Sequence, residues 1–319
     1  MYNLMLLACS LISAADQGVD TNIVPRSSSV DESPAPKDYP RAGALVSTVM
    51  LAKWIETRTE KLVIVDARGD DDYAQGHLPQ ARNIPSDMLQ NTQNPPYLMP
   101  TVDELKALSA RVGIDADSHV IVYDEDDGRL AARVWFTLHA YGHDNAAILN
   151  GGAAKWKEEG REWTEKLPAA VAKAGTFQPL ANLRGVCKSD DLSQFRMRVQ
   201  EIGKLPPTTM LDARSLQEYM GEVVRGKSGG HIPGAANLEW SALMSGKEHA
   251  RVWRSAPEIH TILHLTGVER DQKTAIYDQA GGRSAHLYFT LWLMGFDKAF
   301  NYVAGWREYG NRDDVEIEK

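Results

Sequence analysis

Short runs of apolar residues alternate with stretches of helical periodicity from residue 45 to about residue 163. Residues 62–65 and 120–123 are continuous apolar runs of strand length, whereas residues 101–112 and 130–141 place apolar residues three and four positions apart. Parallel strands need a long crossover between them, and a helix of this length supplies one. The pattern therefore predicts an α/β domain of strand–helix–strand units around a parallel sheet.

The second half of the chain repeats the short motifs of the first half in the same order. The sequence Asp-Ala-Arg closes a predicted strand in both halves, and a Gly-His-Leu/Ile-Pro turn follows each time. Four ordered matches predict an internal duplication and two domains of one fold. The corresponding segments are 65–68 and 210–214, 76–84 and 230–238, 120–124 and 274–278, and 149–152 and 302–306.

The length of 319 residues agrees with two domains that each bury a core of their own. We predict a first domain at residues 43–163 and a second at 206–319. The segment 164–205 is rich in Ala, Lys, Pro and Gly and has weak periodicity, which is typical of an inter-domain linker.

The stretch 274–296 carries the candidate chemistry. A short apolar run ends at Asp278, a loop containing glycine follows, and a helix-length apolar pattern then begins. A loop between a strand and a helix N-terminus directs several backbone N–H groups and the helix dipole at one point. We expect an anion to bind at that point.

Residues 276–284, Ile-Tyr-Asp-Gln-Ala-Gly-Gly-Arg-Ser, resemble the active-site loop of the rhodanese family, usually written C-x-x-G-x-R. Gly281 and Arg283 match that motif, but Asp278 stands where these thiosulfate and 3-mercaptopyruvate sulfurtransferases have their nucleophilic cysteine. With the Asp-Ala-Arg and Gly-His-Ile-Pro-Gly-Ala motifs, the resemblance covers about residues 43–312. It implies two tandem rhodanese-like domains, each a five-stranded parallel sheet flanked by helices, with a catalytically silent first domain.

A carboxylate cannot become a persulfide as a cysteine thiolate does. We therefore expect Asp278 to cap its own loop and helix, and persulfide transfer to be lost or weakened. The expected ligand is a small sulfur-containing anion or another oxyanion. The candidate binding residues are Gln279, Ala280, Gly281, Gly282, Arg283, Ser284, Arg214 and Arg225. A structural ion pair or a solvated surface charge is the competing interpretation for each arginine.

Under two alternative hypotheses the protein is an active enzyme. Asp278 could serve as the nucleophile or general base of a hydrolase. Alternatively, Cys187 could provide a sulfurtransferase with another thiol, because Arg184 and Lys188 flank it and could lower its pKa. The competing interpretation for Cys187, which lies in the linker, is a partly buried and inert thiol.

Other side chains have structural interpretations. Asp66 and Asp212 recur beside a turn in both halves, so they are predicted to accept backbone N–H bonds. The acidic residues 124–127 are the first-half counterpart of the loop at 278, and we expect an exposed acidic loop there; a divalent-cation site is the alternative.

Composition narrows the function classes further. A net charge of -8 argues against nucleic-acid binding. Cys9 and Cys187 are the only cysteines of the chain, which excludes a disulfide framework or a cysteine-rich metal site, and no cluster of histidines indicates a metal. We therefore expect neither a metal nor a cofactor.

Residues 4–12 form an apolar run that is too short to span a membrane and resembles the end of a secretory signal, although a basic region before it is missing. Leu6-Leu7-Ala8-Cys9 is similar to a bacterial lipobox and would tether the protein to a membrane through Cys9, whereas 13–15 would suit ordinary cleavage. Residues 1–42 are thus predicted to be a signal- or lipoprotein-like segment and a disordered tether. The protein would be periplasmic or membrane-anchored, or cytoplasmic if this segment is not a signal.

Overall fold

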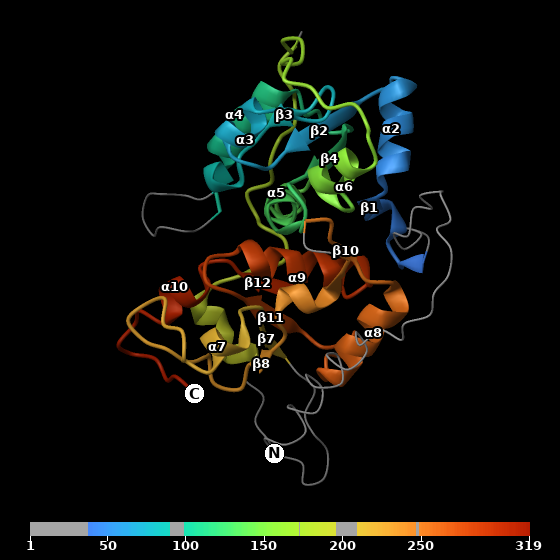
Figure 1. Ribbon diagram of the computed structural model, residues 1–319. Helices are drawn as coiled ribbons and strands as arrows, with labels where there is room; N and C mark the ends of the chain where they lie inside the picture. The colour runs from blue at the N-terminus through green and yellow to red at the C-terminus, as the bar shows by residue number, and fades with distance from the viewer. Residues whose placement is uncertain (1–37, 90–98, 172, 196–208, 247–248) are drawn as a thin grey trace, which may run out of the picture. The chain divides into compact units, whose positions relative to one another are not determined.

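The computed structural model describes residues 38–89, 99–171, 173–195, 209–246 and 249–319. They form two α/β domains that follow one another along the chain (Figure 1). The predictions for the signal, the lipobox at Cys9 and most of the tether lie outside the described residues. None of the described helices is long and apolar enough to cross a lipid bilayer.

The first domain is built on a parallel sheet whose strand order is β1-β5-β4-β2-β3. The central strand β4 is buried at four of its five residues, as expected for a strand covered on both faces. The strands are β1 (Leu45–Val46), β2 (Leu62–Asp66), β3 (Arg82–Asn83), β4 (His119–Tyr123) and β5 (Ala146–Leu149).

Helices lie on both sides of this sheet (Figure 1). Thr101 begins one of them with the predicted capping box, in which its side chain accepts the N–H of Glu104 and the Glu104 carboxylate accepts the N–H of Thr101. The helices are α2 (Thr48–Glu56), α3 (Asp70–Ala74), α4 (Val102–Val112), α5 (Arg129–Ala140) and α6 (Gly152–Glu158), with short 3-10 turns η2 (Ala42–Ala44) and η3 (Ser86–Leu89).

The second domain has the same topology, with strand order β6-β12-β11-β7-β8. Each strand takes the sheet position of its counterpart in the first domain, which confirms the duplication and the two tandem five-stranded parallel sheets. The strands are β6 (Val186–Cys187), β7 (Met210–Asp212), β8 (Ala236–Asn237), β11 (Thr274–Tyr277) and β12 (Ala299–Tyr302).

The edge strand β6 lies within the segment 164–205 that the sequence assigns to the linker. It pairs with β12 through the register Asn301 to Val186 and Tyr302 to Cys187. A strand of two residues is too short to show periodicity, so the composition of the surrounding segment hides it.

The remaining elements of the second domain are helical except for one antiparallel hairpin, β9 (Met244–Ser245) and β10 (Val252–Trp253). The helical elements are η4 (Ser189–Phe195), α7 (Leu216–Tyr219), η5 (Trp240–Leu243), α8 (Ala256–Leu265), α9 (Gly282–Leu293) and α10 (Gly305–Tyr309).

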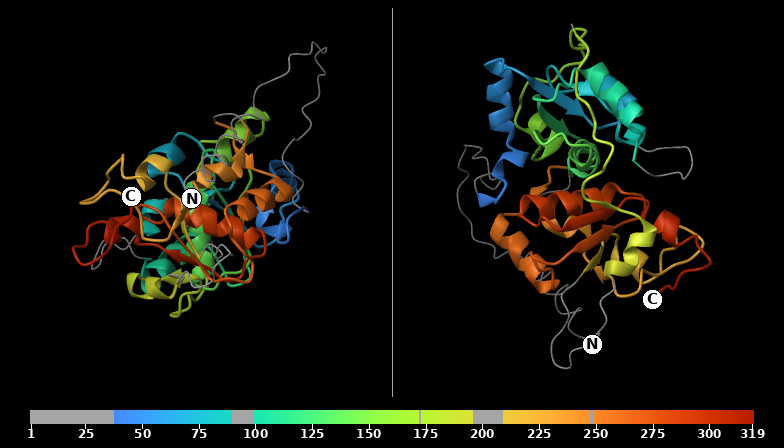
Figure 2. Two further views of the ribbon diagram at one scale, coloured as in Figure 1. Left: turned by 90° about the horizontal axis from the view of Figure 1, so that it is seen from below. Right: turned by 180° about the vertical axis from the view of Figure 1, so that it is seen from behind.

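Helices α5 and α9 join the two domains, since they pack against each other between the two sheets (Figure 2). The ring of Trp135 meets that of Phe289 edge to face at 4.8 Å, and Phe136 meets Tyr288 in the same way at 4.8 Å. All four side chains are at most 5% exposed. The apolar residues of α9 therefore form core packing, and that core belongs to both domains.

We expect Phe289→Ala to lower the free energy of unfolding by about 3–5 kcal/mol, because it removes a fully buried ring and leaves a cavity at this contact. Leu265→Ala is the matched control: Leu265 is 63% exposed, so its loss should change stability by less than about 0.5 kcal/mol. Urea unfolding of the two variants measures the difference. Equal effects would show that the buried ring of Phe289 at the contact between α5 and α9 does not stabilise the fold.

Candidate functional site

The candidate site begins where β11 ends and the chain turns into α9. Gly281 allows this turn, since its φ of +90° is a left-handed conformation that residues with a side chain rarely adopt. A Cβ atom at Gly281 would lie 2.7 Å from Nη1 of Arg133 and 3.0 Å from the carbonyl oxygen of Val303. The shape of the loop is therefore fixed by close contacts with both domains.

Asp278 occupies the centre of the loop and is 3% exposed. Its Oδ1 accepts hydrogen bonds from the N–H groups of Ala280, at 3.0 Å, and Gly281, and from the Ser284 hydroxyl at 3.2 Å. Its Oδ2 accepts the N–H of Arg283 at 2.8 Å. The N–H groups that converge on this point thus already bind a carboxylate of the chain itself, the capping arrangement that the sequence predicts.

Arg283 extends from the loop to Glu218 and binds it with both terminal nitrogens, at 2.5 and 3.1 Å. Glu218 also receives Nε of Arg225 at 2.8 Å. Its side chain is 2% exposed and accepts the N–H of Ser215 in a capping box. One buried carboxylate therefore holds two of the three arginines that the sequence analysis names as candidate binding residues.

Burial by itself would raise the pKa of Glu218, but the hydrogen bonds and charge of Arg283, the N–H of Ser215 and the charge of Arg225 lower it to about 2. Burial likewise disfavours the charged form of Arg283, and its bonds to Glu218 and the charge of Asp278 raise its pKa above the ordinary value. Both groups are ionised at neutral pH, so this is a true ion pair.

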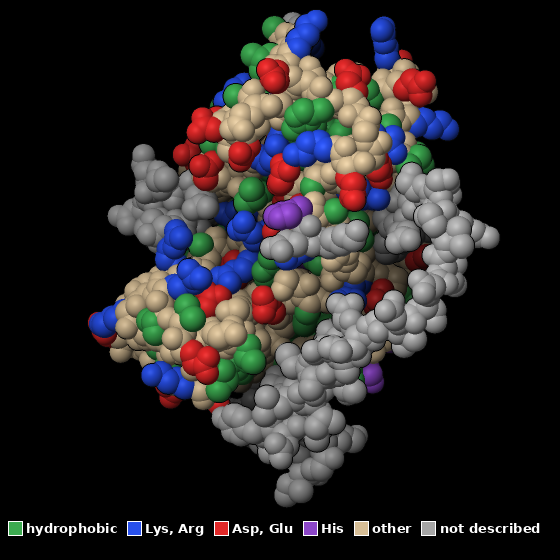
Figure 3. Space-filling view, in the orientation of Figure 1, with side chains coloured by type: hydrophobic (Ala, Val, Ile, Leu, Met, Phe, Trp, Pro, Cys, Tyr) green, Lys and Arg blue, Asp and Glu red, His purple; other side chains and the backbone are tan. Residues whose placement is uncertain are grey.

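A cavity of about 440 Å³ opens beside the loop, and side chains of both domains line it. The loop contributes Asp278, Gln279, Ala280, Gly282 and Arg283. The first domain contributes Ser86, Arg129, Leu130 and Arg133, and the rest of the second domain contributes Arg225, Trp240 and Arg307. Lys and Arg side chains gather between the two domains on the face shown in Figure 3. Five arginines against Asp278 and the nearby Glu218 give this cavity an excess of positive charge.

Of the predicted binding residues, Gly281 and Ser284 bind Asp278 but do not line the cavity. Arg214 lies inside the fold at 1% exposure, where Nε and Nη2 contact the carboxylate of Asp212 and Nη2 also donates to the carbonyl of Gly230 at 2.7 Å. Its guanidinium lies over the ring of Trp306, 4.4 Å from the centroid. Arg214 therefore does not reach the cavity in this arrangement.

The first domain has the same arrangement of an arginine, an aspartate and a glycine carbonyl. Arg68 binds the carboxylate of Asp66 and the carbonyl of Gly76, the latter at 2.7 Å. Oδ1 of Asp66 and Oδ1 of Asp212 each accept a backbone N–H two residues later, at 2.9 Å. The repeated Asp-Ala-Arg motif thus ties a strand end to the following Gly-His turn, and the structural prediction for both aspartates is confirmed.

Asp124, the counterpart of Asp278, also binds its own loop. Its Oδ1 accepts the N–H of Gly128 at 3.0 Å, and its Oδ2 accepts those of Leu130 and Ala131 at 2.8 and 3.1 Å. Burial, followed by the charge of Asp127, raises the pKa of Asp124 to about 7. Of the four acidic residues expected to be exposed, Asp124 is therefore buried, at 2% exposure, because it caps the helix that follows.

Cys187 lies on β6 and is 5% exposed. Burial raises its pKa to about 12, and the charge of Asp191 acts in the same direction. The hypothesis that Arg184 and Lys188 lower this pKa is wrong, because Arg184 pairs with Asp144 at 2.9 Å instead and burial dominates. The thiol is protonated and inert at neutral pH.

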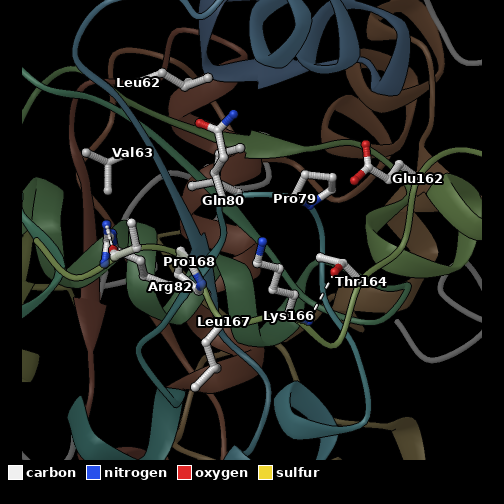
Figure 4. A pocket seen from close by; sticks show the side chains of 12 residues that line it. Leu62, Val63, Pro79, Gln80, Arg82, Glu162, Thr164, Lys166, Leu167 and Pro168 are labelled. Atoms are coloured by element: carbon white, nitrogen blue, oxygen red, sulfur yellow. Dashed lines mark hydrogen bonds between the residues drawn. The ribbon is translucent and has the colours of Figure 1, made fainter.

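A second cavity, of about 420 Å³, lies in the first domain, and none of the predicted binding residues line it (Figure 4). Its charged side chains are Arg82, Glu162 and Lys166, and the start of β2 and residues 164–169 form much of its wall. Since it is remote from the loop at 278, the candidate site is the cavity between the domains.

Sequence reasoning missed several residues of the site. The role of Glu218 could not be recognised, because Ser215 and Glu218 have the spacing of an ordinary capping box. Arg129 and Arg133 stand four positions apart, which places them on one helix face, and this spacing is the signal that could have found them. Trp240 and Arg307 had no signal of this kind.

Comparisons with known proteins agree with the fold and the duplication. The family model described as a rhodanese-like domain matches residues 50–159 and 198–312. The thiosulfate sulfurtransferase of Pseudomonas aeruginosa is 31% identical over 259 residues, which cover 81% of this chain and 91% of that protein. The 3-mercaptopyruvate sulfurtransferase of Escherichia coli (strain K12) is 27% identical over 288 residues, covering 84% and 96%.

Solved structures share the fold. The anaerobic ergothioneine biosynthesis enzyme from Chlorobium limicola matches 88% of this chain and 71% of its own with a TM-score of 0.73 at 22% identity. The protein YnjE matches 88% and 69% with a TM-score of 0.76 at 21% identity. At these identities the likeness concerns the fold alone.

We expect the contribution of Glu218 to stability to depend on pH. Its pKa is lower in the folded protein, so the ionised side chain stabilises the fold above about pH 4.5, and this stabilisation is lost as the pH falls toward 2. Glu218→Gln should therefore cost about 2 kcal/mol at pH 7, with allowance for solvent screening, and progressively less in acid.

Urea unfolding of the wild type and of Glu218→Gln at pH 7, 4.5 and 3 measures this difference. Glu222→Gln, an exposed position in the same region, is the control and should differ little from the wild type at any pH. A loss for Glu218→Gln that stays constant over the whole range would show that the ion pair is not its cause.

Proposed function

Since the chain belongs to the rhodanese family of sulfurtransferases, with two rhodanese-like domains in tandem, we propose that its second domain binds a small sulfur-containing anion or another oxyanion in the cavity beside Asp278. We further propose that this domain no longer transfers sulfur through a persulfide. The single observation that carries the proposal is the carboxylate of Asp278, which takes the N–H groups of its loop at the position of the family's nucleophile.

Persulfide transfer needs a thiolate that attacks sulfur, holds it covalently and releases it to an acceptor. A carboxylate oxygen offers no comparable bond to sulfur. Asp278 also has both oxygens engaged by hydrogen-bond donors at 3% exposure. This geometry suits a structural cap better than the nucleophile or base of a hydrolase.

Cys187 gives little support to an active sulfurtransferase. Its thiol is buried on β6 with a pKa of about 12, so only a minute fraction is thiolate at neutral pH. It is also absent from the residues that line the cavity beside Asp278. The alternative of an enzyme that uses this thiol would require β6 to leave the sheet edge.

The kind of ligand follows from charge and from the relatives. Five arginines line the cavity, and the relatives from Pseudomonas aeruginosa and Escherichia coli are named for thiosulfate and 3-mercaptopyruvate, both sulfur-containing anions. Guanidinium groups bind oxyanions by charge-assisted hydrogen bonds. An anion of this class therefore suits the site even where the sulfur is not transferred.

We expect the wild type to show only background turnover with thiosulfate and cyanide and with 3-mercaptopyruvate, and Cys187→Ser to be indistinguishable from it. In Asp278→Cys, the N–H groups that now bind the carboxylate would stabilise a thiolate. This variant should gain activity and be alkylated by iodoacetamide at residue 278 at pH 7, while Cys187 remains unmodified in mass analysis of the peptides.

Strong wild-type turnover in these assays that Cys187→Ser does not reduce would refute the proposed loss of persulfide chemistry. Wild-type turnover that is abolished by Cys187→Ser would show that Cys187 on β6 is the nucleophile. Asp278→Ser is the matched control for Asp278→Cys: it also removes the carboxylate but supplies no thiol, so it should remain inactive.

We also propose that the chain is exported, on the basis of the signal-like residues 4–12. The mass of the mature N-terminus after expression in a bacterium with lipoprotein processing tests this proposal. A lipidated Cys9 is one expected result and cleavage after Ala15 the other; recovery of the intact N-terminus in the cytoplasm would refute export.

A further inference from the structure

The loop at Asp278 has little to offer an incoming anion. Asp278 accepts hydrogen bonds from the N–H groups of Ala280, Gly281 and Arg283. Glu218 forms ion pairs with the guanidinium groups of Arg283 and Arg225. An anion at this loop would therefore meet two carboxylates and no unoccupied N–H among these donors, so the positive charge that attracts it has to come from elsewhere in the cavity.

Arg133 supplies such a charge from the first domain. It lies on α5, lines the cavity and is 2% exposed. Its Nη1 and Nη2 make long contacts to the carbonyls of Gly281 and Leu89, at 3.5 and 3.2 Å, and its Nε has no hydrogen-bond partner among the described residues. Burial lowers the pKa of Arg133 to about 10, so it remains protonated at pH 7.

A buried guanidinium that is held by two carbonyls and by no carboxylate is costly unless another group compensates it. Within the described part of the chain, no carboxylate forms an ion pair with Arg133. Asp278 is the carboxylate whose charge favours the ionised form, but its oxygens face its own loop. An anion in the cavity that Arg133 lines would supply the counter-charge that the described residues do not.

Arg129 stands one helical turn before Arg133 and lines the same cavity. Its side chain makes no ion pair with the described residues, and its Cγ would be 3.9 Å from a Cβ atom added at Gly282. Arg129 thus reaches across to the second domain beside Arg133. The two side chains form a cationic pair on one face of α5.

The cavity is larger than an inorganic anion requires. Its volume of about 440 Å³ falls in the range of about 300–1,000 Å³ that is typical of sites for larger organic ligands. Leu130 and Trp240 are the two large apolar side chains among its otherwise mostly polar lining residues. An indole ring and an aliphatic side chain favour an apolar or aromatic body.

We propose that the ligand is an organic oxyanion whose acidic head binds Arg129 and Arg133 of the first domain and whose apolar body lies against Leu130 and Trp240. This inference rests on the anion-binding function proposed above and assigns its charged contacts to the first domain rather than to the loop at Asp278. Such a ligand touches both domains, because Arg133 belongs to one and Trp240 to the other.

Isothermal titration of the full chain with 2-naphthalenesulfonate and with sodium sulfate, in a buffer free of other oxyanions, tests the proposal. The naphthalenesulfonate should bind at least about tenfold more tightly than sulfate because it also fills the apolar part of the cavity. Arg129→Gln and Arg133→Met should each weaken its binding by about tenfold or more. Arg184→Gln, which removes an exposed charge outside the cavity, is the control and should leave binding within about twofold.

Arg283→Gln separates this inference from the proposed function. Binding that survives Arg129→Gln and Arg133→Met but is lost in Arg283→Gln would place the head at the loop, and the assignment to the first domain would fail while anion binding stands. Failure of both anions to bind the wild type would overturn both. If Arg133→Met does not fold by circular dichroism, Arg129→Gln decides alone, because this half-buried side chain forms no hydrogen bond or ion pair with the described residues.

Discussion

The hydrogen bonds between Asp278 and its own loop are the constraint on which the rest of the site depends. Backbone N–H groups at the end of β11 and the start of α9 converge on one point, and such a point is stable only when something negative occupies it. Here the side chain at the first position of the loop does so, at distances of 2.8–3.2 Å for three of its four contacts. The loop is therefore complete without a ligand.

The first domain meets the same constraint in the same way through Asp124, although its loop is built differently. Helix α5 begins at Arg129, five residues after Asp124, whereas α9 begins at Gly282, four residues after Asp278. Arg133 and His286 are each the fifth residue of their helix. The ring of His286 stacks on that of Trp253 at 4.7 Å, and burial lowers its pKa to about 3, so of the two only Arg133 brings a charge to the cavity.

Much of the fold could be predicted because its signals are local. The capping box at Thr101, the apolar strands and the repeated Asp-Ala-Arg motif each depend on residues close in sequence. The loop at residues 276–284 could be located for the same reason. For Arg133 the only local signal is its spacing from Arg129, because its contacts with Leu89 and Gly281 are 44 and 148 positions away in the sequence. The prediction for Arg214 failed for the opposite reason. Its place in the sequence suggests a binding residue, but hydrogen bonds to Asp212 and to the carbonyl of Gly230 hold its side chain inside the fold.

If Asp278 replaces the family's cysteine, as we propose, more changes than the chemistry of one atom. A thiol in such a loop remains available for reaction, whereas a carboxylate that accepts several N–H bonds stabilises the loop and leaves little reason for an external anion to approach it. Yet the cavity retains five arginines for two carboxylates, and one of these arginines is buried without a counter-charge. Selection for stability alone would favour an apolar side chain at such a position, since replacing a buried charge by a well-packed apolar residue is often stabilising. The buried charge at Arg133 is therefore better explained by a ligand than by the fold.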